Sequence, residues 1–115
     1  MKTLTAEQYD AFWREGVLVV EDAVTPQQLA ALRATFDQWV EDSRQHDDDY
    51  GETLDGRKRF DLQPGHSAET PGLRRVQSPE EVSDVFASVM RSARTVDVVG
   101  DLIGPNLRFH HGKVN

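Results

Sequence analysis

Metal chemistry in this chain would depend on histidine, because the 115-residue sequence contains four histidines and no cysteine. A non-haem iron site with two histidines and one carboxylate needs a His-x-Asp or His-x-Glu motif and a distant second histidine. The stretch His46-Asp47-Asp48 matches that motif literally. It lies where a helix is expected to fray into an acidic loop, and helical residues i and i+2 diverge by about 200° around the axis. We therefore interpret His46 as part of a solvated helix end.

A second group of candidate residues lies in the last twelve residues, GPNLRFHHGKVN. A turn is expected to open a strand there, and strand side chains alternate between two faces. One face would carry Leu107, Phe109, His111 and Lys113, and the other Arg108, His110, Gly112 and Val114. Polar groups at the end of an apolar row need partners, so an interior site is predicted near His111 and Lys113. An ordinary core or rim histidine is an equal alternative for His111.

The basic residues and the remaining histidine form a third group. Arg57, Lys58 and Arg59 are interpreted as solvated loop charge, since acidic residues surround them and no aromatic residues alternate with them. Of Arg74 and Arg75, only one can face inward from a strand, where a guanidinium group would bind a carboxylate or phosphate. Alternation does not choose between them, because Leu73 and Val76 lie on opposite faces. His66, in PGHSAE, is interpreted as an exposed loop histidine.

Three segments with the same pattern are expected to begin helices at Thr5, Thr25 and Ser78. In each, a hydroxyl residue can accept a hydrogen bond from the backbone three residues on, where Gln or Glu can return one. Proline follows directly in the second and third segments, which suits the first helical position. These capping signals place three helix starts before any packing is considered.

The rest of the chain predicts alternating helices and strands. Residues 6–15 form a helix ended by Gly16, and residues 17–20 a strand covered on both faces. The helix from Pro26 reaches the mid-forties, and residues 46–72 form an extended loop region in which RFDLQPGHS holds a short strand. A strand over 73–76, two helices from Pro79 to the Gly104-Pro105 stop and the final strand complete an α+β fold in one domain, residues 1–115.

Composition narrows the classes of partner. The formal net charge of −7 argues against a broad nucleic-acid or anionic-membrane surface. No apolar run approaches the roughly 20 residues of a membrane span, and the N-terminus lacks an apolar leader segment. A cytoplasmic protein without disulfides is expected. Glycine-rich phosphate loops, G-x-S-x-G and H-E-x-x-H motifs are absent from the sequence.

Taken in order, several segments resemble the phytanoyl-CoA dioxygenase family of Fe(II)- and 2-oxoglutarate-dependent oxygenases. The resemblance covers nearly the whole chain and corresponds to the N-terminal portion of the family's domain. Each motif is weak alone, and the order and spacing carry the resemblance. The segments are GVLVVEDAV, TPQQLAALR, RFDLQPGHSAE, LRRVQSPEEV and VVGDLIGPNLRFHHGKVN.

The resemblance implies a double-stranded β-helix, or jelly roll, of which this chain supplies the helical front and the first strands. It implies Fe(II) as cofactor and 2-oxoglutarate as co-substrate, which is decarboxylated to succinate while a small-molecule or acyl substrate is hydroxylated. Arg75 corresponds to the basic residue that approaches the co-substrate, and Lys113 and His111 to positions lining the same site. The family's iron ligands fall after the last strand, so no metal ligand and no catalytic residue is expected in this chain, which should be inactive alone.

The resemblance leaves several alternatives open. Relatives act on acyl-CoA thioesters, osmolytes and natural products, and some halogenate instead of hydroxylating. A non-catalytic binding module derived from the same fold, holding a ligand or a protein through the acidic loop or near Arg75, is the alternative function. An unpaired apolar final strand would also favour self-association.

Overall fold

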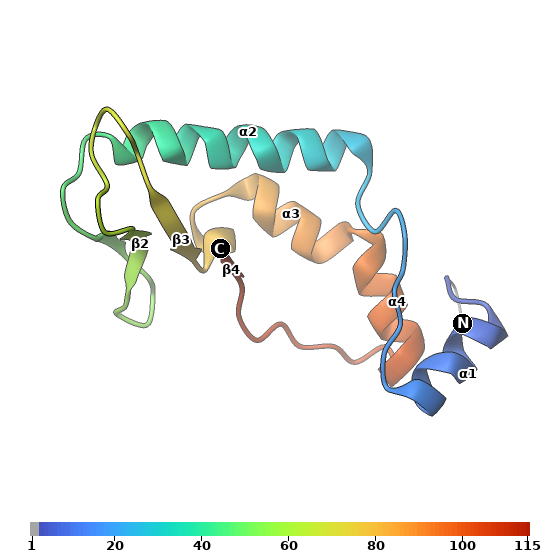
Figure 1. Ribbon diagram of the computed structural model, residues 1–115. Coiled ribbons are helices and arrows are strands. Elements are labelled where there is room, and N and C mark those ends of the chain that lie inside the picture. Colours follow the sequence, from blue (N-terminus) through green and yellow to red (C-terminus); the bar gives the residue numbers. More distant parts are fainter. Residues whose placement is uncertain (1–2) are drawn as a thin grey trace.

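The computed structural model describes residues 3–115, which form four α-helices, a short 3-10 helix and four strands (Figure 1). The long helix α2 runs along one side, the sheet lies at one end and α1 at the other. The elements are α1 (Ala6–Glu15), α2 (Pro26–Ser43), β1 (Tyr50–Glu52), β2 (Lys58–Leu62), β3 (Leu73–Gln77), η1 (Pro79–Glu81), α3 (Asp84–Ser92), α4 (Arg94–Ile103) and β4 (Lys113–Val114).

The first two predicted helix starts are confirmed. Thr5 accepts a hydrogen bond from the Gln8 backbone N–H at 3.1 Å, and the Gln8 side chain accepts one from Thr5 N–H at 2.9 Å. Thr25 and Gln28 form the same reciprocal pair. Gly16 ends α1 in the left-handed conformation, with φ of 81°, as predicted. These signals are local, so they hold whatever the helices pack against.

The third predicted helix start is wrong. Ser78 has a φ of 48° and makes no capping bond, and only the single turn η1 follows it. Its backbone N–H instead donates to Gly112 O at 2.9 Å, which extends the contact between β3 and the C-terminal segment. Helix α3 begins six residues later at Asp84, where Ser83 accepts from Phe86 N–H. The Ser78 N–H, which the capping pattern would have paired with the Glu81 side chain, therefore bonds to the C-terminal segment instead.

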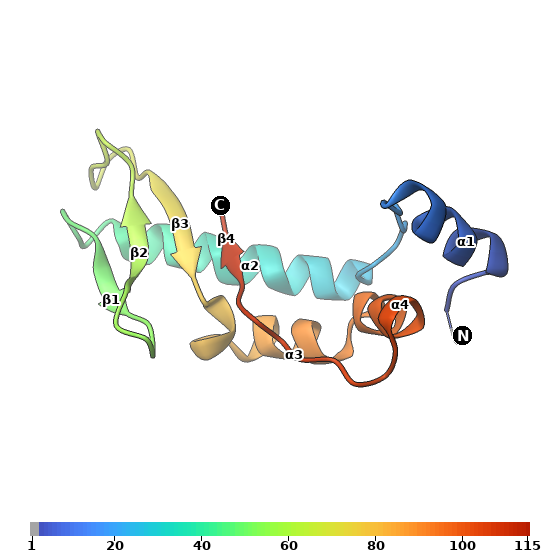
Figure 2. The same cartoon turned by 90° about the horizontal axis from the view of Figure 1, so that it is seen from below.

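The four strands form one antiparallel sheet in the order β1-β2-β3-β4, visible edge to edge in Figure 2. Strand β3 and the short strand within RFDLQPGHS are confirmed, but the predicted loop region also contains β1. Strands β1 and β2 make a hairpin whose turn is closed by two bonds between Thr53 and Arg57, one to the threonine hydroxyl. Residues 46–72 are thus more regular than the sequence predicted.

Two predicted strands are absent or shortened. Residues 17–20 form no strand, and Val17 and Val19 are 62% and 82% exposed. The four described strands pair only with one another, so these residues have no partner strand, and β-branched composition alone does not make a strand. At the other end, residues 105–112 are irregular and only Lys113–Val114 pairs with β3. The predicted alternation over Leu107 to Lys113 therefore does not exist as strand geometry.

Aromatic packing joins the sheet to the helices. Four rings contact one another in sequence from Tyr50 through Phe60 and Trp39 to Phe86, with centroid separations of 4.7, 5.9 and 5.3 Å. Val76 of β3 is fully buried on the same face of the sheet. At the far end, Asp101 of α4 accepts from the backbone N–H groups of Thr3 and Leu4 at 2.7 and 2.8 Å. The aromatic contacts and the buried Val76 thus cover one face of the sheet, which leaves the opposite face for polar side chains.

Candidate functional site

The two faces of the sheet differ in chemistry. The register places Phe60 opposite Val76, and Val76 opposite Val114, so these apolar residues share the face that α2 covers. Asp61 lies opposite Arg75, and Gln77 opposite Lys113. Alternation therefore gathers charged and polar residues on the other face, which is the candidate site: Arg59, Asp61, Arg75, Gln77 and Lys113.

Arg75, rather than Arg74, lies on this polar face. Its guanidinium Nε donates to Asp61 Oδ2 at 2.7 Å across the two central strands. The side chains are 31% and 14% exposed, so the ion pair is partly shielded from water. Within residues 3–115, no hydrogen bond uses the terminal amines Nη1 and Nη2 of Arg75. Those amines present the planar pair of donors that binds a carboxylate.

Lys113 lies on the edge strand β4, diagonal to Arg75 across the β3–β4 pair. Diagonal neighbours are about 7–8 Å apart at Cα, which long side chains span. Lys113 is exposed, and no ion pair within the described residues involves it. The fold therefore brings two of the three predicted site residues to the same face.

His111, the third predicted site residue, is not placed there by strand geometry. It is exposed and precedes β4, and its ring contacts that of His110 at a centroid distance of 4.4 Å. The prediction that His111 shares a strand face with Lys113 is wrong, because pairing with β3 begins only at Lys113. Its role in a site stays a prediction without that support.

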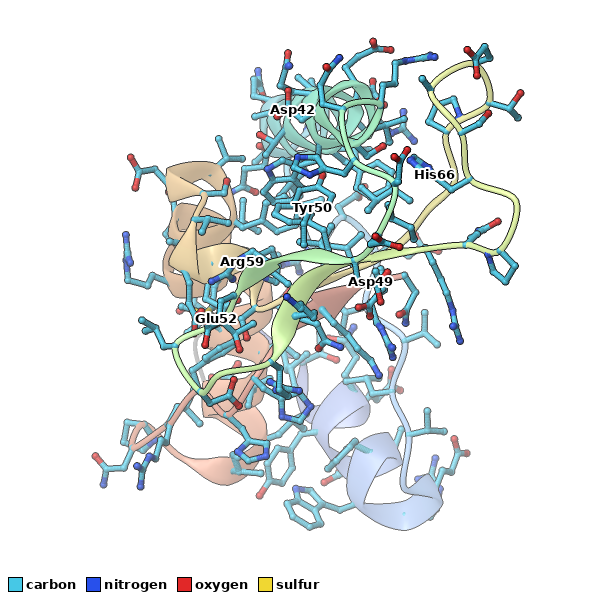
Figure 3. The ribbon with its side chains drawn as sticks, turned by 90° about the vertical axis from the view of Figure 1, so that its left-hand side faces the viewer. Asp42, Asp49, Tyr50, Glu52, Arg59 and His66 are labelled. Carbon is cyan, nitrogen blue, oxygen red and sulfur yellow. The ribbon has the colours of Figure 1, made fainter. Side chains whose placement is uncertain are left out.

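Arg59 is a buried residue that the sequence interpretation assigned to solvent. Its Nη1 donates to the carbonyls of Gln77 and Ser78 at 3.0 and 2.7 Å, and its Nη2 to the Glu52 carbonyl at 2.9 Å and Glu81 Oε1 at 2.8 Å. The hydrogen bond from Arg59 holds the pKa of Glu81 below its usual range, against the opposing effect of burial. Figure 3 shows Arg59 beside Glu52. No local signal in the sequence could have revealed this burial, because the carbonyls that bind Arg59 come from two separate segments.

The other two histidines have structural roles. The prediction that His66 is an exposed loop residue is wrong, because its Nε2 lies 3.0 Å from Ser43 O and 2.9 Å from His46 O, at the end of α2 (Figure 3). Its Nδ1 accepts from Gly72 N–H at 2.9 Å, so the ring joins the helix end to the loop before β3. The His46 ring stacks on Tyr50 at 3.5 Å. The interpretation of His46 as solvated is therefore wrong, because its ring packs on β1, whereas Asp47 and Asp48 are exposed.

Metal ligands do not gather in the part of the chain that the structure describes. Among residues 3–115, no three His, Cys, Asp or Glu side chains lie close enough to hold an ion. The described residues thus do not fit an iron centre. The same residues contain no helix long and apolar enough to cross a membrane.

Comparison with known proteins gives a distant relative. The chain is 24% identical over 110 residues to a curated protein of Stutzerimonas stutzeri, described as a probable alpha-ketoglutarate-dependent hypophosphite dioxygenase. The match covers 96% of this chain and 36% of that protein, so the chain spans just over a third of the relative's length. No protein-family model and no solved structure matches. Alpha-ketoglutarate is another name for 2-oxoglutarate.

This similarity supports a relationship to the 2-oxoglutarate-dependent oxygenases. The observed α+β fold, with helices and a small antiparallel sheet, is consistent with a fragment of an oxygenase fold. Membership of the phytanoyl-CoA dioxygenase family stays a prediction, as do the site roles of Arg75, Lys113 and His111.

Proposed function

We propose that this chain forms the co-substrate-binding side of a 2-oxoglutarate-dependent dioxygenase of the phytanoyl-CoA dioxygenase kind, built on a jelly roll. The observation that supports the proposal is the hydrogen bonding of the Arg75 guanidinium. The guanidinium is held at Nε by Asp61, while both terminal amines have no hydrogen-bond partner within residues 3–115. In a chain similar to an alpha-ketoglutarate-dependent enzyme, a carboxylate of 2-oxoglutarate is the natural ligand for those amines.

Charge on the polar face favours a carboxylate there. Arg59 is paired with Glu81, and Arg75 with Asp61, so the two arginines are balanced by acids. Lys113 adds a positive charge with no ion-pair partner in the described range. The Lys113 ammonium can therefore attract the carboxylate that Arg75 would bind. Because the described residues do not fit an iron centre, the proposal assigns them only the binding and orientation of the co-substrate.

The test is binding of 2-oxoglutarate to the protein that carries this chain, measured by calorimetry without oxygen. Arg75→Gln should weaken binding about ten- to a hundredfold, because a charge-assisted pair of hydrogen bonds is lost. Arg74→Gln is the matched control, since Arg74 is exposed and its neighbour in sequence. Equal affinities for the two variants would contradict the proposal.

Turnover provides the second measurement. Succinate release in the presence of Fe(II) would establish the reaction class, with hypophosphite as the first substrate to test because the relative is named for it. Binding of 2-oxoglutarate without succinate release would favour the alternative, a non-catalytic binding module of the same fold.

A further inference from the structure

Asp61 holds Arg75 in a way that leaves the arginine able to bind a second anion. The guanidinium group has a side edge at Nε and an end edge formed by Nη1 and Nη2. One oxygen of Asp61 takes the side edge at 2.7 Å. Within residues 3–115 the end edge makes no hydrogen bond, so the existing ion pair and an incoming carboxylate need not compete for the same donors.

The backbone of β2 is irregular directly next to Asp61. Asp61 lies directly opposite Arg75, and the register of β2 and β3 shifts between Asp61 and Leu62. At this irregularity the Leu62 N–H donates to the side chain of Asp49 at 2.7 Å. Such irregularities twist a strand and redirect the neighbouring side chain. The aspartate thus lies on a central strand with its side chain only 14% exposed.

We propose that Asp61 is a positioning residue for Arg75, which orients the guanidinium so that its terminal amines meet a carboxylate of 2-oxoglutarate. This inference rests on the proposed function. A long arginine side chain loses rotamer freedom when it binds a ligand, and a partner that orders it beforehand reduces that loss. Asp61 therefore aids binding by ordering the Arg75 side chain before the ligand arrives, although the negative charge of Asp61 alone would oppose an anion.

Ordering of Arg75 by Asp61 strengthens the binding of an anion, whereas the negative charge of Asp61 weakens it. These opposite effects make the role of Asp61 testable. If Asp61 positions Arg75, its removal weakens 2-oxoglutarate binding even though the face becomes more positive. If the pair is only structural, its removal frees a positive charge and strengthens binding. The neighbouring charged groups, which include Lys113, the Arg59–Glu81 pair and Asp49, are unchanged in both cases.

The experiment is a calorimetric titration with 2-oxoglutarate, without oxygen and with and without added Fe(II), on the protein that carries this chain. Asp61→Ala should weaken binding about tenfold and Asp61→Asn about threefold, as the charge-assisted bond is lost or weakened. In an Arg75→Gln background, neither change should weaken binding further. Asp48→Asn, an exposed acid with the same charge change, is the control and should bind as the wild type does.

The outcomes separate the two proposals. A wild-type protein that does not bind 2-oxoglutarate would overturn the proposed function, and the role of Asp61 with it. If the wild type binds 2-oxoglutarate and Asp61→Ala binds it equally well or more tightly, only the positioning role is overturned. The same holds if Asp61→Ala weakens binding equally in the wild-type and Arg75→Gln backgrounds. Thermal melting of each variant identifies one that does not fold, and Asp61→Asn, which keeps the shape of the side chain, then decides.

Discussion

At the scale of single residues, three adjacent basic side chains have different environments. Arg57 forms an exposed pair with Asp55, and Lys58 is exposed on β2. Arg59 is 4% exposed and donates four hydrogen bonds. Exposed ion pairs contribute little to stability, whereas a buried charge is costly when its partners are removed. Arg59 and Glu81 therefore matter for the fold in a way that Arg57 and Asp55 do not.

The Arg59–Glu81 pair predicts acid sensitivity. Because the pKa of Glu81 is lower in the folded protein, the stabilisation is fully present above its unfolded pKa, about 4.3, and is lost as pH falls through the lower folded pKa. Glu81→Gln should therefore lower the melting temperature at pH 7 and flatten its decrease on acidification below about pH 4.3. Glu80→Gln is the neighbouring control. A parallel acid profile for Glu81→Gln and the wild type would contradict the prediction.

At the scale of elements, the aromatic contacts between β1, β2 and α2 contain one unsatisfied group. The Tyr50 hydroxyl is buried without a hydrogen-bond partner within the described residues, although its ring stacks between His46 and Phe60. Burial raises the pKa of Tyr50, with a further rise from the charge of Asp42. The ring thus stabilises the helix–sheet contact, while the hydroxyl contributes nothing to it.

Tyr50→Phe should therefore leave the free energy of unfolding unchanged or raise it by up to about 1 kcal/mol, because the desolvated hydroxyl is removed and the stacking stays. Chemical denaturation measures the change. Tyr9→Phe on α1, away from these rings, controls for loss of a tyrosine hydroxyl in general. A loss above about 1 kcal/mol at Tyr50 would show that its hydroxyl has a partner.

At the scale of the whole molecule, the fold is elongated. Its radius of gyration is 17.2 Å, whereas a compact domain of this length has about 13 Å. A hollow of about 580 Å³ lies between α3, α4 and residues 106–109, and Ile103 and Phe109 beside it are 64% and 48% exposed. Strand β4, an edge of the sheet in the described chain, follows directly. Exposed apolar surface next to an open strand edge favours association.

We predict that the 115-residue chain self-associates through β4 and the apolar segment before it. Phe109→Ser should raise the dissociation constant about tenfold, because burial of one aromatic side chain is lost. Sedimentation velocity over a range of concentrations measures this. Leu54→Ser, at an 89% exposed position on the β1–β2 turn, is the matched control. A concentration-independent monomer for the wild type would contradict the prediction.

The sequence by itself determined the features whose causes lie within a few residues. Reciprocal capping at Thr5 and Thr25 and the left-handed Gly16 follow from local bonding. Strand pairing depends on residues far apart in sequence, so the order β1-β2-β3-β4 and the shortness of β4 were decided by the tertiary structure.

On the polar face, too, some features follow from the sequence and others only from the tertiary structure. The sequence allowed either Arg74 or Arg75 to face inward, and the pairing of β2 with β3 set Arg75 opposite Asp61. It also offered no reason to separate Arg59 from Arg57. Burial of Arg59 follows from the carbonyls of Glu52, Gln77 and Ser78, which only the assembled sheet brings together. Side-chain environments that depend on several distant backbone groups belong to the tertiary structure, because no single segment contains them.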